Sequence, residues 1–359
     1  MARIALDASY ILASNPTGTS TYSRRLIESL AALDTPHDFL LCYRLSRFFR
    51  RREVRRPGGG RLSSRLMEDP WTFWLPREAG LFHSLAQRPP AFRFKREVVT
   101  VHDVFPITGR DYSAPDFQRK FSGLLRRAVS RADRIISDSE YTASEMARHC
   151  AVDRDKIRVI PLGVDQPRDV LSPEQRRLER ERLVGEGNEM LLAVGVIETR
   201  KNLGNALRAL QHLPERYRLV LAGGDGYGSE AIHAPARLEP RVKMLGYVSR
   251  ARLGILYQAA GALLFPSLEE GFGLPVLEAM SHGLPVVASR TSSLPEVGGT
   301  AALYVDPHDP LDIAEKVTEA VESAGCRERL VRMGLERARQ FTWRRTAEET
   351  LKVYEELLR

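Results

Sequence analysis

Apolar and polar positions follow two recurring patterns along this chain of 359 residues. Short continuous runs of Val, Ile and Leu are typical of strands buried on both faces, and the longer amphipathic stretches between them are typical of helices. The runs predict strands at Arg3–Asp7, Phe39–Tyr43, Leu81–His83, Glu97–His102, Arg134–Ser137, Lys156–Pro161, Met190–Gly195, Arg218–Ala222, Val242–Leu245, Ala262–Phe265, Pro285–Ala288 and Ala302–Tyr304. The amphipathic stretches predict helices at Thr21–Leu33, Phe117–Ser130, Thr142–His149, Leu203–Gln211, Arg250–Ala259, Leu277–His282 and Asp312–Ser323. This alternation predicts βαβ units with parallel sheets, and so an α/β fold.

The predicted strands and helices divide into two consecutive sets along the chain. A proline-rich segment, Pro161–Pro173 (PLGVDQPRDVLSP), follows the first set, and a second set begins at Met190. We therefore expect two Rossmann-like domains, residues 1–165 and 166–340, that face each other across a cleft. Such domains bind ligands beyond the carboxyl ends of their strands. The tail, Phe341–Arg359, predicts a helix whose apolar side packs on one of the two domains.

Composition agrees with this picture, because 43% hydrophobic and 28% charged residues are typical of a soluble globular protein. The N-terminus is too short and polar for a signal peptide, and no apolar run approaches the roughly 20 residues that span a bilayer. The three cysteines, Cys42, Cys150 and Cys326, are odd in number and far apart, and they fit neither a metal-ligand spacing nor a disulfide framework. We therefore expect a cytoplasmic protein.

The charge is uneven. Residues 1–165 contain 28 Lys and Arg against 19 Asp and Glu, whereas the whole chain has a net charge of +8, so the remaining residues are close to neutral. Much of the excess lies in Arg44–Arg65, which predicts a loop with a basic helical piece and is followed by Trp71, Phe73 and Trp74. Basic residues with Phe48, Phe49 and further aromatics are typical of contact with an anionic membrane surface at its inner face, although a solvated face beside core aromatics fits equally. Nucleic acid is not expected, because no reading motif accompanies the charge.

The segment Glu270–Glu278 (EGFGLPVLE) follows a predicted strand and runs into a predicted helix. Gly271 and Gly273 allow close backbone approach to a ligand. The amides of Phe272 to Leu274 lie where a helix begins, a position that favours a phosphate group. Glu270 precedes the loop and is suited to accept hydrogen bonds from sugar hydroxyls, while Glu278, two turns later, suits a ribose diol. The alternative is a strand–turn–helix connection with two solvated glutamates.

A basic pair, Arg200 and Lys201, follows the strand Met190–Gly195, next to Glu198. A cation at the carboxyl end of a strand neutralises a diphosphate leaving group. A basic helix start is electrostatically unfavourable, which favours a functional role for these residues over a structural one.

Further candidates sit at predicted strand ends and turns. His102 is placed to bond a sugar hydroxyl or to position an acceptor, although a lone histidine at a strand end is more often structural. The neighbouring Asp103 is a weaker candidate that would also cap a turn. Gly18 would let the backbone approach a phosphate at the start of the first helix. Gly224 lies in a turn expected near a nucleotide, and the segment that ends at Val248 is expected to offer backbone groups to the base.

Two other chemistries are not expected. Neither Asn15–Ser20 nor Gly223–Gly228 has the G-x-G-x-x-G spacing, which argues against NAD. Asp153-Arg154-Asp155 has the letters of a D-x-D metal motif but lies in a polar turn before a strand, so no metal or other cofactor is expected there.

These motifs together resemble a known family. Glu270 and Glu278 form an E-x7-E motif, and the chain resembles retaining glycosyltransferases of family 4, which have the GT-B fold. The resemblance covers most of the chain. It includes the segments LDASYI and GTSTY near the start, VHDVFP, ISDSEYTASEM, IRVIPLGVD, AVGVIETRKNL, LGYVSR and PVVASRTSSLPEV, in this order.

The resemblance implies roles for several residues. In this family the second domain holds the nucleotide and the last helix crosses back, so Phe341–Arg359 is expected on the first domain. The family places an Arg directly after the strand glycine and a Lys five residues later. Lys201 matches the second position, but Val196 occupies the first, so Arg200 is expected to replace the missing Arg. His102 matches a donor-sugar contact.

The resemblance also implies the reaction: metal-independent transfer of a hexose from a nucleotide sugar, with retention of configuration, to a glycan or lipid-linked acceptor of a surface polysaccharide. The segment ETRKN is similar to the EPRKN of some mannosyltransferases and favours GDP-mannose over UDP-glucose. Two alternatives stay open. One is another GT-B enzyme, such as a nucleotide-sugar epimerase or a sugar phosphorylase, and the other is a catalytically silent binding protein.

Overall fold

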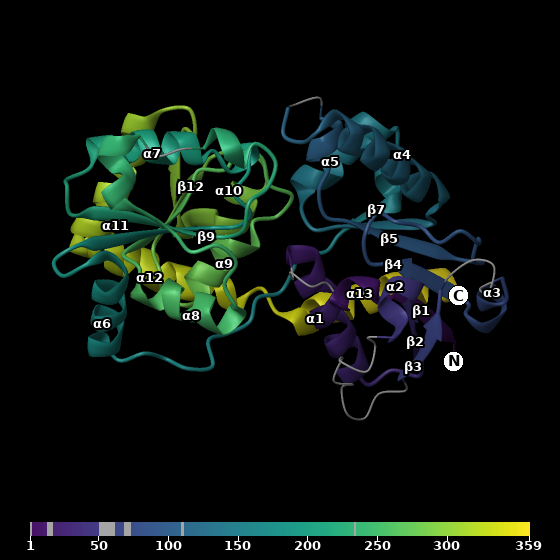
Figure 1. The fold of residues 1–359 in the computed structure, drawn as a ribbon. Helices are drawn as coiled ribbons and strands as arrows, with labels where there is room; N and C mark the ends of the chain where they lie inside the picture. The colour runs from purple at the N-terminus through teal and green to yellow at the C-terminus, as the bar shows by residue number, and fades with distance from the viewer. Residues whose placement is uncertain (1, 13–16, 50–61, 68–72, 109–110, 233–234) are drawn as a thin grey trace. The chain divides into compact units, whose positions relative to one another are not determined.

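The computed structural model describes residues 2–12, 17–49, 62–67, 73–108, 111–232 and 235–359. The chain forms two compact units (Figure 1). Unit 1 comprises Met1–Gly109, Pro115–Gly163 and Phe341–Arg359, and unit 2 comprises Arg110–Ala114 and Val164–Gln340. The main division, at Gly163–Val164, lies two residues before the boundary expected from the sequence.

Unit 1 is built on a parallel sheet of seven strands in the order β3-β2-β1-β4-β5-β6-β7. Its strands are β1 (Arg3–Asp7), β2 (Asp38–Tyr43), β3 (Leu62–Leu66), β4 (Leu81–Ser84), β5 (Glu97–Val101), β6 (Arg134–Ser137) and β7 (Ile157–Val159). Helix α1 (Gly18–Ala32) packs with α13 (Trp343–Leu358) on one face, and α4 (Pro115–Arg131) and α5 (Glu140–Cys150) pack on the other. The shorter helices are η1 (Ala8–Leu12), α2 (Leu45–Phe48), α3 (Leu75–Glu78), η3 (Phe105–Ile107) and η4 (Arg154–Lys156).

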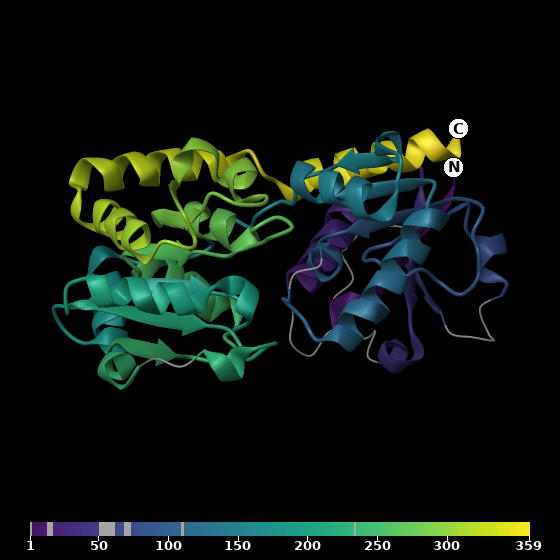
Figure 2. The same ribbon diagram turned by 90° about the horizontal axis from the view of Figure 1, so that it is seen from above.

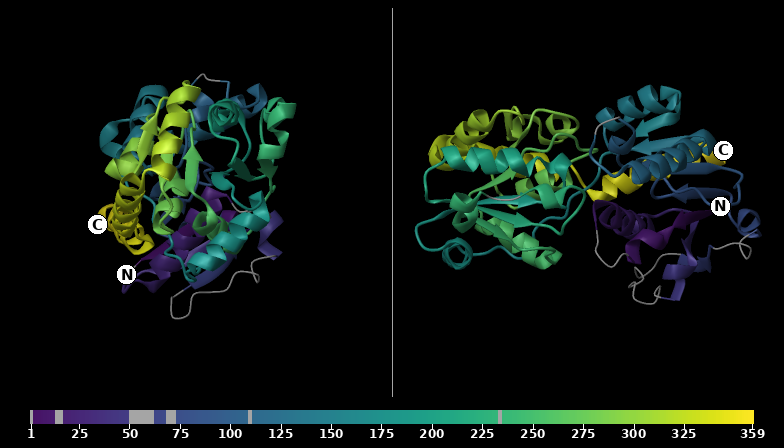
Figure 3. Two further views of the ribbon diagram at one scale, coloured as in Figure 1. Left: turned by 90° about the vertical axis from the view of Figure 1, so that its left-hand side faces the viewer. Right: turned by 45° about the horizontal axis from the view of Figure 1, so that its top comes forward.

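The C-terminal helix α13 belongs to unit 1, as the family resemblance predicted. Figures 2 and 3 show it in yellow within that unit, with its end near the N-terminus. His83 on β4 joins it to the sheet, because its Nδ1 lies 2.5 Å from the Tyr354 hydroxyl and its Nε2 lies 2.8 Å from Thr100 Oγ1. Gly163 allows the chain to pass closely, since a Cβ atom there would lie 2.2 Å from the backbone nitrogen of Trp343.

Unit 2 has a parallel sheet of six strands in the order β10-β9-β8-β11-β12-β13. The strands are β8 (Glu189–Val194), β9 (Tyr217–Ala222), β10 (Val242–Met244), β11 (Ala262–Phe265), β12 (Val286–Ser289) and β13 (Leu303–Val305). Helices α7 (Leu203–His212) and α11 (Pro310–Glu322) cover one face with a continuous apolar core. Helices α6 (Pro173–Val184), α8 (Arg250–Ala259), α9 (Leu274–Ser281) and α12 (Ala324–Arg339) lie on the other (Figure 1). Shorter helices are α10 (Leu294–Gly298), η5 (Thr199–Lys201), η6 (Ser229–Ala231), η7 (Ala236–Arg241) and η8 (Gly299–Ala301).

All twelve predicted strands are present within a few residues of their expected bounds, which confirms the α/β fold. Among the strands and the helices of eight or more residues, three elements were not predicted. β3 overlaps the end of Arg44–Arg65, where a loop was expected. The pattern missed it because this partly buried edge strand contains only two apolar residues in LSSRL. Helix α6 has no buried residue, so it has no apolar stripe to detect. The third is α12, which buries only Leu330, Gly334 and Ala338.

Among the helices of the described residues, none is both long and apolar enough to cross a membrane.

Candidate active site

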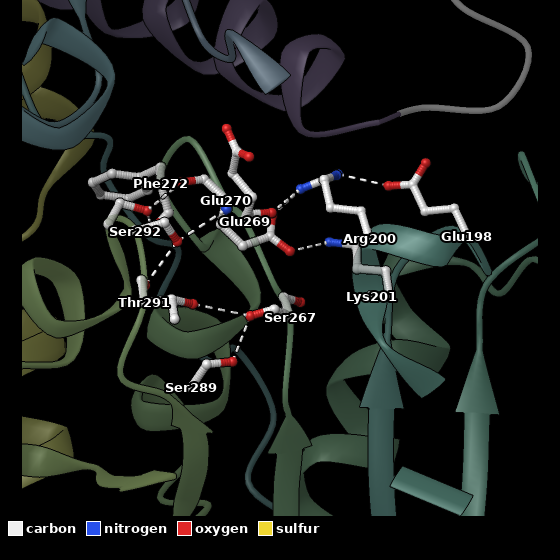
Figure 4. Close-up of polar contacts among 11 residues, drawn as sticks. Glu198, Arg200, Lys201, Ser267, Glu269, Glu270, Phe272, Ser289, Thr291 and Ser292 are labelled. Carbon is white, nitrogen blue, oxygen red and sulfur yellow. Dashed lines mark hydrogen bonds and ion pairs between the residues drawn. The ribbon is translucent and has the colours of Figure 1, made fainter. Parts of the chain in front are cut away.

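Three loops meet at the carboxyl edge of the sheet in unit 2 (Figure 4). They follow β8, β11 and β12, which are neighbours in the sheet because β11 pairs with both of the others. The loop after β8 carries Lys201, the loop after β11 carries Glu270, and the loop after β12 carries Ser292. A small hollow at this edge is lined by Gly195, Lys201 and Ser267, among others.

Glu270 is the centre of a buried cluster of ion pairs. Its Oε1 accepts a hydrogen bond from Lys201 Nζ at 2.6 Å, and its Oε2 accepts one from Arg200 Nη1 at 2.8 Å. Arg200 also donates to Glu198 Oε1 and to the backbone oxygen of Glu269, each at 2.6 Å. The side chains of Arg200 and Glu270 are both 8% exposed. Residues from two motifs that the sequence analysis treated separately therefore form one cluster.

The cluster fixes the charge of Glu270. Burial raises the pKa of this carboxyl group. The charges of Arg200 and Lys201 and the hydrogen bond from Lys201 lower the pKa by more than burial raises it, so it is about 2 instead of 4.5. The carboxylate is therefore ionised at neutral pH. Two carboxylates, Glu198 and Glu270, balance the charges of Arg200 and Lys201. The sequence alone had not indicated that these two basic side chains are paired.

Arg200 and Lys201 are held differently. Two contacts of Arg200, with Glu269 and Glu270, join the loop after β8 to the loop after β11, and the third, with Glu198, lies within its own loop. Lys201 has a flexible stem that passes over Gly195, whose added Cβ would lie 3.1 Å from Lys201 Cε, and its ammonium group lies 4.9 Å from the centre of the Phe265 ring. The prediction that Arg200 contacts a diphosphate stays a prediction.

Hydroxyl groups after β12 hold the Glu270 loop in place. Ser293 Oγ donates to the backbone oxygens of Glu270 and Phe272, both at 2.9 Å, and the backbone N–H of Glu270 donates to Ser292 Oγ at 3.0 Å. Thr291 Oγ1 donates to the backbone oxygen of Ser267 at 3.2 Å. Sequence reasoning assigned no role to these residues. A run of hydroxyl residues directly after a strand, SRTSS, was the available signal.

The glycine loop ends at the first turn of α9. Gly273 has φ of +98°, which a residue with a side chain rarely adopts, and an added Cβ would lie 2.6 Å from Leu294 Cδ2. Helix α9 begins at Leu274, three residues earlier than the sequence predicted. The predicted donor-binding amides of Gly271 to Leu274 are therefore located at a helix N-terminus.

Gly224 lies in a loop that packs against the loop after β8. Ile197 forms a parallel bridge with Asp225, and a Cβ on Gly223 would lie only 1.7 Å from the backbone oxygen of Gly195. A Cβ on Gly224 would meet nothing within 4 Å. The close approach of this loop to the loop after β8 therefore requires glycine at position 223, whereas a side chain at position 224 would meet no neighbouring atom.

Glu278, on α9, belongs to a second cluster. Its Oε2 accepts from the Tyr257 hydroxyl at 3.0 Å, and Arg250 Nη2 lies 3.4 Å from its Oε1 and 3.1 Å from Asp165 Oδ2. Burial raises the pKa of the Glu278 carboxyl group. The Arg250 charge and the Tyr257 hydrogen bond lower this pKa by less, so it remains above its usual value. Val248 lies just before α8, two residues from Arg250.

His102 is engaged within unit 1. Its Nδ1 lies 2.6 Å from Asp138 Oδ2, and its Nε2 lies 2.9 Å from the backbone oxygen of Leu85. Burial lowers the pKa of His102, but the Asp138 charge and hydrogen bond, the Leu85 carbonyl and the Asp103 charge outweigh it and raise the pKa. Two acceptors suit a doubly protonated ring, which agrees with the raised pKa, and the contact of His102 with a sugar stays a prediction.

Gly18 is the first residue of α1, and an added Cβ there would meet nothing within 4 Å. Asn15 and Pro16, which precede it in the predicted loop, lie outside the described residues.

Part of the arginine-rich segment has internal partners. Arg44 Nη2 lies 3.5 Å from Asp7 Oδ2, and Arg47 Nη1 donates to the backbone oxygen of Leu12. Phe49 and Phe73 are exposed. Phe48 packs against Phe49, and Trp74 packs against a buried core of unit 1. Arg50, Arg51, Arg52, Arg55, Arg56 and Trp71 lie outside the described residues.

Within the part of the chain that the structure describes, no group of His, Cys, Asp or Glu side chains is suited to hold a metal ion. Asp153 instead accepts a hydrogen bond from the backbone N–H of Asp155 and begins η4.

Two family models match the chain. Residues 174–337 match "Glycosyl transferases group 1", and residues 16–168 match "Glycosyltransferase Family 4". The chain is also 34% identical over 271 residues to the O-antigen chain mannosyltransferase B of Escherichia coli, covering 73% of this chain and 71% of the relative. The chain belongs to glycosyltransferase family 4. A D-inositol 3-phosphate glycosyltransferase of Xylanimonas cellulosilytica is 30% identical over 300 residues, which cover 79% of this chain and 70% of that protein.

Solved structures show the same fold. Sucrose-phosphate synthase from Thermosynechococcus elongatus superposes with a TM-score of 0.75 at 19% identity, covering 100% of this chain and 99% of that chain. WaaG, a glycosyltransferase involved in lipopolysaccharide biosynthesis, superposes with a TM-score of 0.72 at 16% identity, covering 98% of this chain and 99% of that chain. This family 4 glycosyltransferase therefore has the two-domain GT-B fold that the sequence predicted.

Proposed function

We propose that this glycosyltransferase moves a hexose, mannose in preference to glucose, from a nucleoside diphosphate to a hydroxyl group of a glycan or lipid-linked acceptor in surface polysaccharide synthesis. Transfer proceeds with retention of configuration and without a metal. The observation that carries the proposal is the buried Glu270–Lys201 pair beside the N-terminus of α9. Similarity to the mannosyltransferases of Escherichia coli, O-antigen chain mannosyltransferase B and WbdA, supports GDP-mannose as the donor.

The donor would extend along the edge of the sheet. The amides at Gly273 and Leu274 receive the phosphates, because backbone N–H groups and the helix dipole favour negative charge there. Glu278 accepts hydrogen bonds from the ribose, and Glu270 orients the sugar. The two carboxylates lie on either side of the phosphate position and serve neutral hydroxyl groups, so they do not repel the donor.

Lys201 would stabilise the leaving group. When the bond between the anomeric carbon and the diphosphate oxygen breaks, its electron pair stays on that oxygen, and negative charge grows there. The Lys201 ammonium, on a flexible stem and 2.6 Å from Glu270, is able to turn toward this charge while Arg200 keeps Glu270 in place. The acceptor oxygen bonds to the same face of the sugar, and its proton passes to the departing phosphate oxygen.

Donor hydrolysis tests this proposal without a known acceptor. Lys201→Met removes the charge and keeps most of the stem, and we expect kcat for hydrolysis of GDP-mannose to fall on the order of 10²–10³-fold. Lys316→Met is the matched control, because Lys316 pairs with Glu319 on the surface of α11. Hydrolysis of the Lys201 variant at the control's rate would contradict the role of Lys201.

The same assay separates the alternatives. A screen over GDP- and UDP-sugars identifies the donor, and product analysis with and without an acceptor distinguishes transfer from epimerisation or phosphorolysis. A protein that binds the nucleotide and hydrolyses none of the donors would be a silent binding protein. Attachment at the inner face of the membrane is a separate proposal, and flotation with anionic liposomes tests it.

A further inference from the structure

A second hollow lies at the opposite edge of the unit 2 sheet. Its lining includes Ala259 and Ala260, just before β11, and Leu284, just before β12. Because parallel strands all begin at one edge, this hollow and the candidate active site are at the two ends of the same strands. Its cavity volume is about 210 Å³, which is smaller than the roughly 300–1,000 Å³ of sites for drug-sized ligands.

Arginine dominates the lining. Arg176, Arg177 and Arg180 come from α6, and Arg327 comes from α12. Figure 1 shows both helices on the α8 side of the sheet. Arginine presents a planar fork of donors that matches phosphate oxygens, whereas an aliphatic or aromatic lining would suit an apolar ligand.

The four arginines are only partly neutralised. Arg177 Nη1 donates to Glu181 Oε1 at 2.8 Å, and Arg180 Nη1 lies 3.7 Å from Glu189 Oε2. The two others bond backbone oxygens: Arg176 Nε donates to Leu171 O at 3.0 Å, and Arg327 Nη1 donates to Gly261 O at 3.3 Å. Within the described residues, neither Arg176 nor Arg327 forms an ion pair, so neither guanidinium has a carboxylate at contact distance, although the charge of Glu189 acts on Arg327.

Holding these cations together is unfavourable without an anion. Burial lowers the pKa of the Arg327 guanidinium, Glu189 opposes this, and the charges of Arg180 and Arg176 lower it further. The α6 helix exposes other arginines to solvent, such as Arg182, whose side chain is 76% exposed. Arg176 and Arg327 instead converge on one hollow from two helices, where like charges repel.

We propose that this hollow binds a phosphate or diphosphate group, with Arg176 and Arg327 as its main ligands. The site is distinct from the donor site and does not rest on the proposed function. Tyr257 and His282 line the hollow and also contact Glu278: the Tyr257 hydroxyl donates to its carboxylate, and His282 Nδ1 lies 2.7 Å from its backbone oxygen. The donor cluster and this site therefore share side chains, and binding has to be measured with the donor site occupied.

Titration with inorganic pyrophosphate tests the proposal. The full chain is saturated with GDP or UDP, whichever it binds, and pyrophosphate is added in a calorimeter. We expect one further equivalent to bind, and the double variant Arg176→Gln with Arg327→Gln to bind at least about tenfold more weakly, since two charge-assisted contacts are lost. The matched control is Arg182→Gln with Arg329→Gln, which removes two charges from the same two helices, and its affinity should stay within twofold of wild type.

Two further arms complete the test. Arg176→Lys, which keeps the charge but loses the fork, should also weaken binding, and it serves if the double variant does not fold. Sedimentation with phosphatidylglycerol vesicles distinguishes the source of the group: binding to vesicles that depends on Arg176 and Arg327, without binding of pyrophosphate, assigns a lipid headgroup. Absence of both interactions, or equal binding by the double variant and its control, would overturn the proposal.

Discussion

Replacing Glu270 by Gln removes the charge at the centre of the candidate active site and keeps the shape of the side chain. Glu270 accepts hydrogen bonds from Lys201 at 2.6 Å and from Arg200 at 2.8 Å, and its side chain is 8% exposed. In the variant two buried cations face a neutral amide. One of them also faces an NH2 group, which cannot accept its hydrogen bond.

The structure sets the magnitude. The pKa of Glu270 is about 2 in the folded protein and 4.5 otherwise, a difference of about 2.5 units. At about 1.4 kcal/mol per unit, the ionised carboxylate contributes roughly 3 kcal/mol to folding at pH 7. Because the folded pKa is the lower one, this contribution is fully present above pH 4.5 and is lost as the pH falls toward 2. About 2 kcal/mol should remain at pH 3.5.

Urea unfolding followed by far-ultraviolet circular dichroism measures the difference at pH 7 and pH 3.5. All three tryptophans of the sequence, Trp71, Trp74 and Trp343, fall in unit 1, so their fluorescence separates unfolding of that unit from unfolding of unit 2. Glu319→Gln is the control. It breaks a surface pair with Lys316, and such pairs contribute about 0–1 kcal/mol. If Glu270→Gln at pH 7 lowers the free energy of unfolding by no more than this control does, the Glu270 carboxylate does not contribute the roughly 3 kcal/mol derived from its pKa.

Two more predictions follow from close packing and from buried polar contacts. Gly223→Ala should destabilise unit 2 by about 2 kcal/mol or more, because its Cβ would lie 1.7 Å from the Gly195 backbone oxygen, whereas Gly224→Ala should leave the melting temperature nearly unchanged. Equal melting temperatures for the two variants would contradict the close approach of the loops. Tyr354→Phe should destabilise unit 1 by about 1–3 kcal/mol and increase amide hydrogen exchange in α13, because His83 Nδ1 loses its partner. Burial and the nearby His102 lower the pKa of His83 to about 3, below the usual 6.5, so wild-type stability should decline as the pH falls below 6.5. Unchanged exchange in α13 would argue against the His83–Tyr354 contact as its anchor.

The sequence indicated candidate site residues but not the contacts among them. Glu198, Arg200, Lys201 and Glu270 were each identified from local motifs, yet nothing local indicated that they neutralise one another. That depends on the pairing of β8 with β11, which brings residues about 70 positions apart into contact. The hydroxyl residues after β12 were overlooked for the same reason, since their partners are backbone oxygens of another loop.

Strands with continuous apolar runs were predictable because burial on both faces leaves a local signature. Edge strand β3 and the solvent-facing helix α6 lack it, since neither buries a full face. The arginine-lined hollow was beyond prediction: α6 reads as a charged surface helix, and only its packing beside α12 directs Arg176 and Arg327 to one place.

By itself, the sequence determined the fold class, the family and the loop that carries Glu270, because these depend on local periodicity and on motifs with fixed spacing. Only the tertiary structure decided the charge state of the site and the interaction partners of each ionisable group. Charge interactions and desolvation depend on distance in space, and in a parallel sheet that distance is set by strand order, which no local segment of the chain encodes.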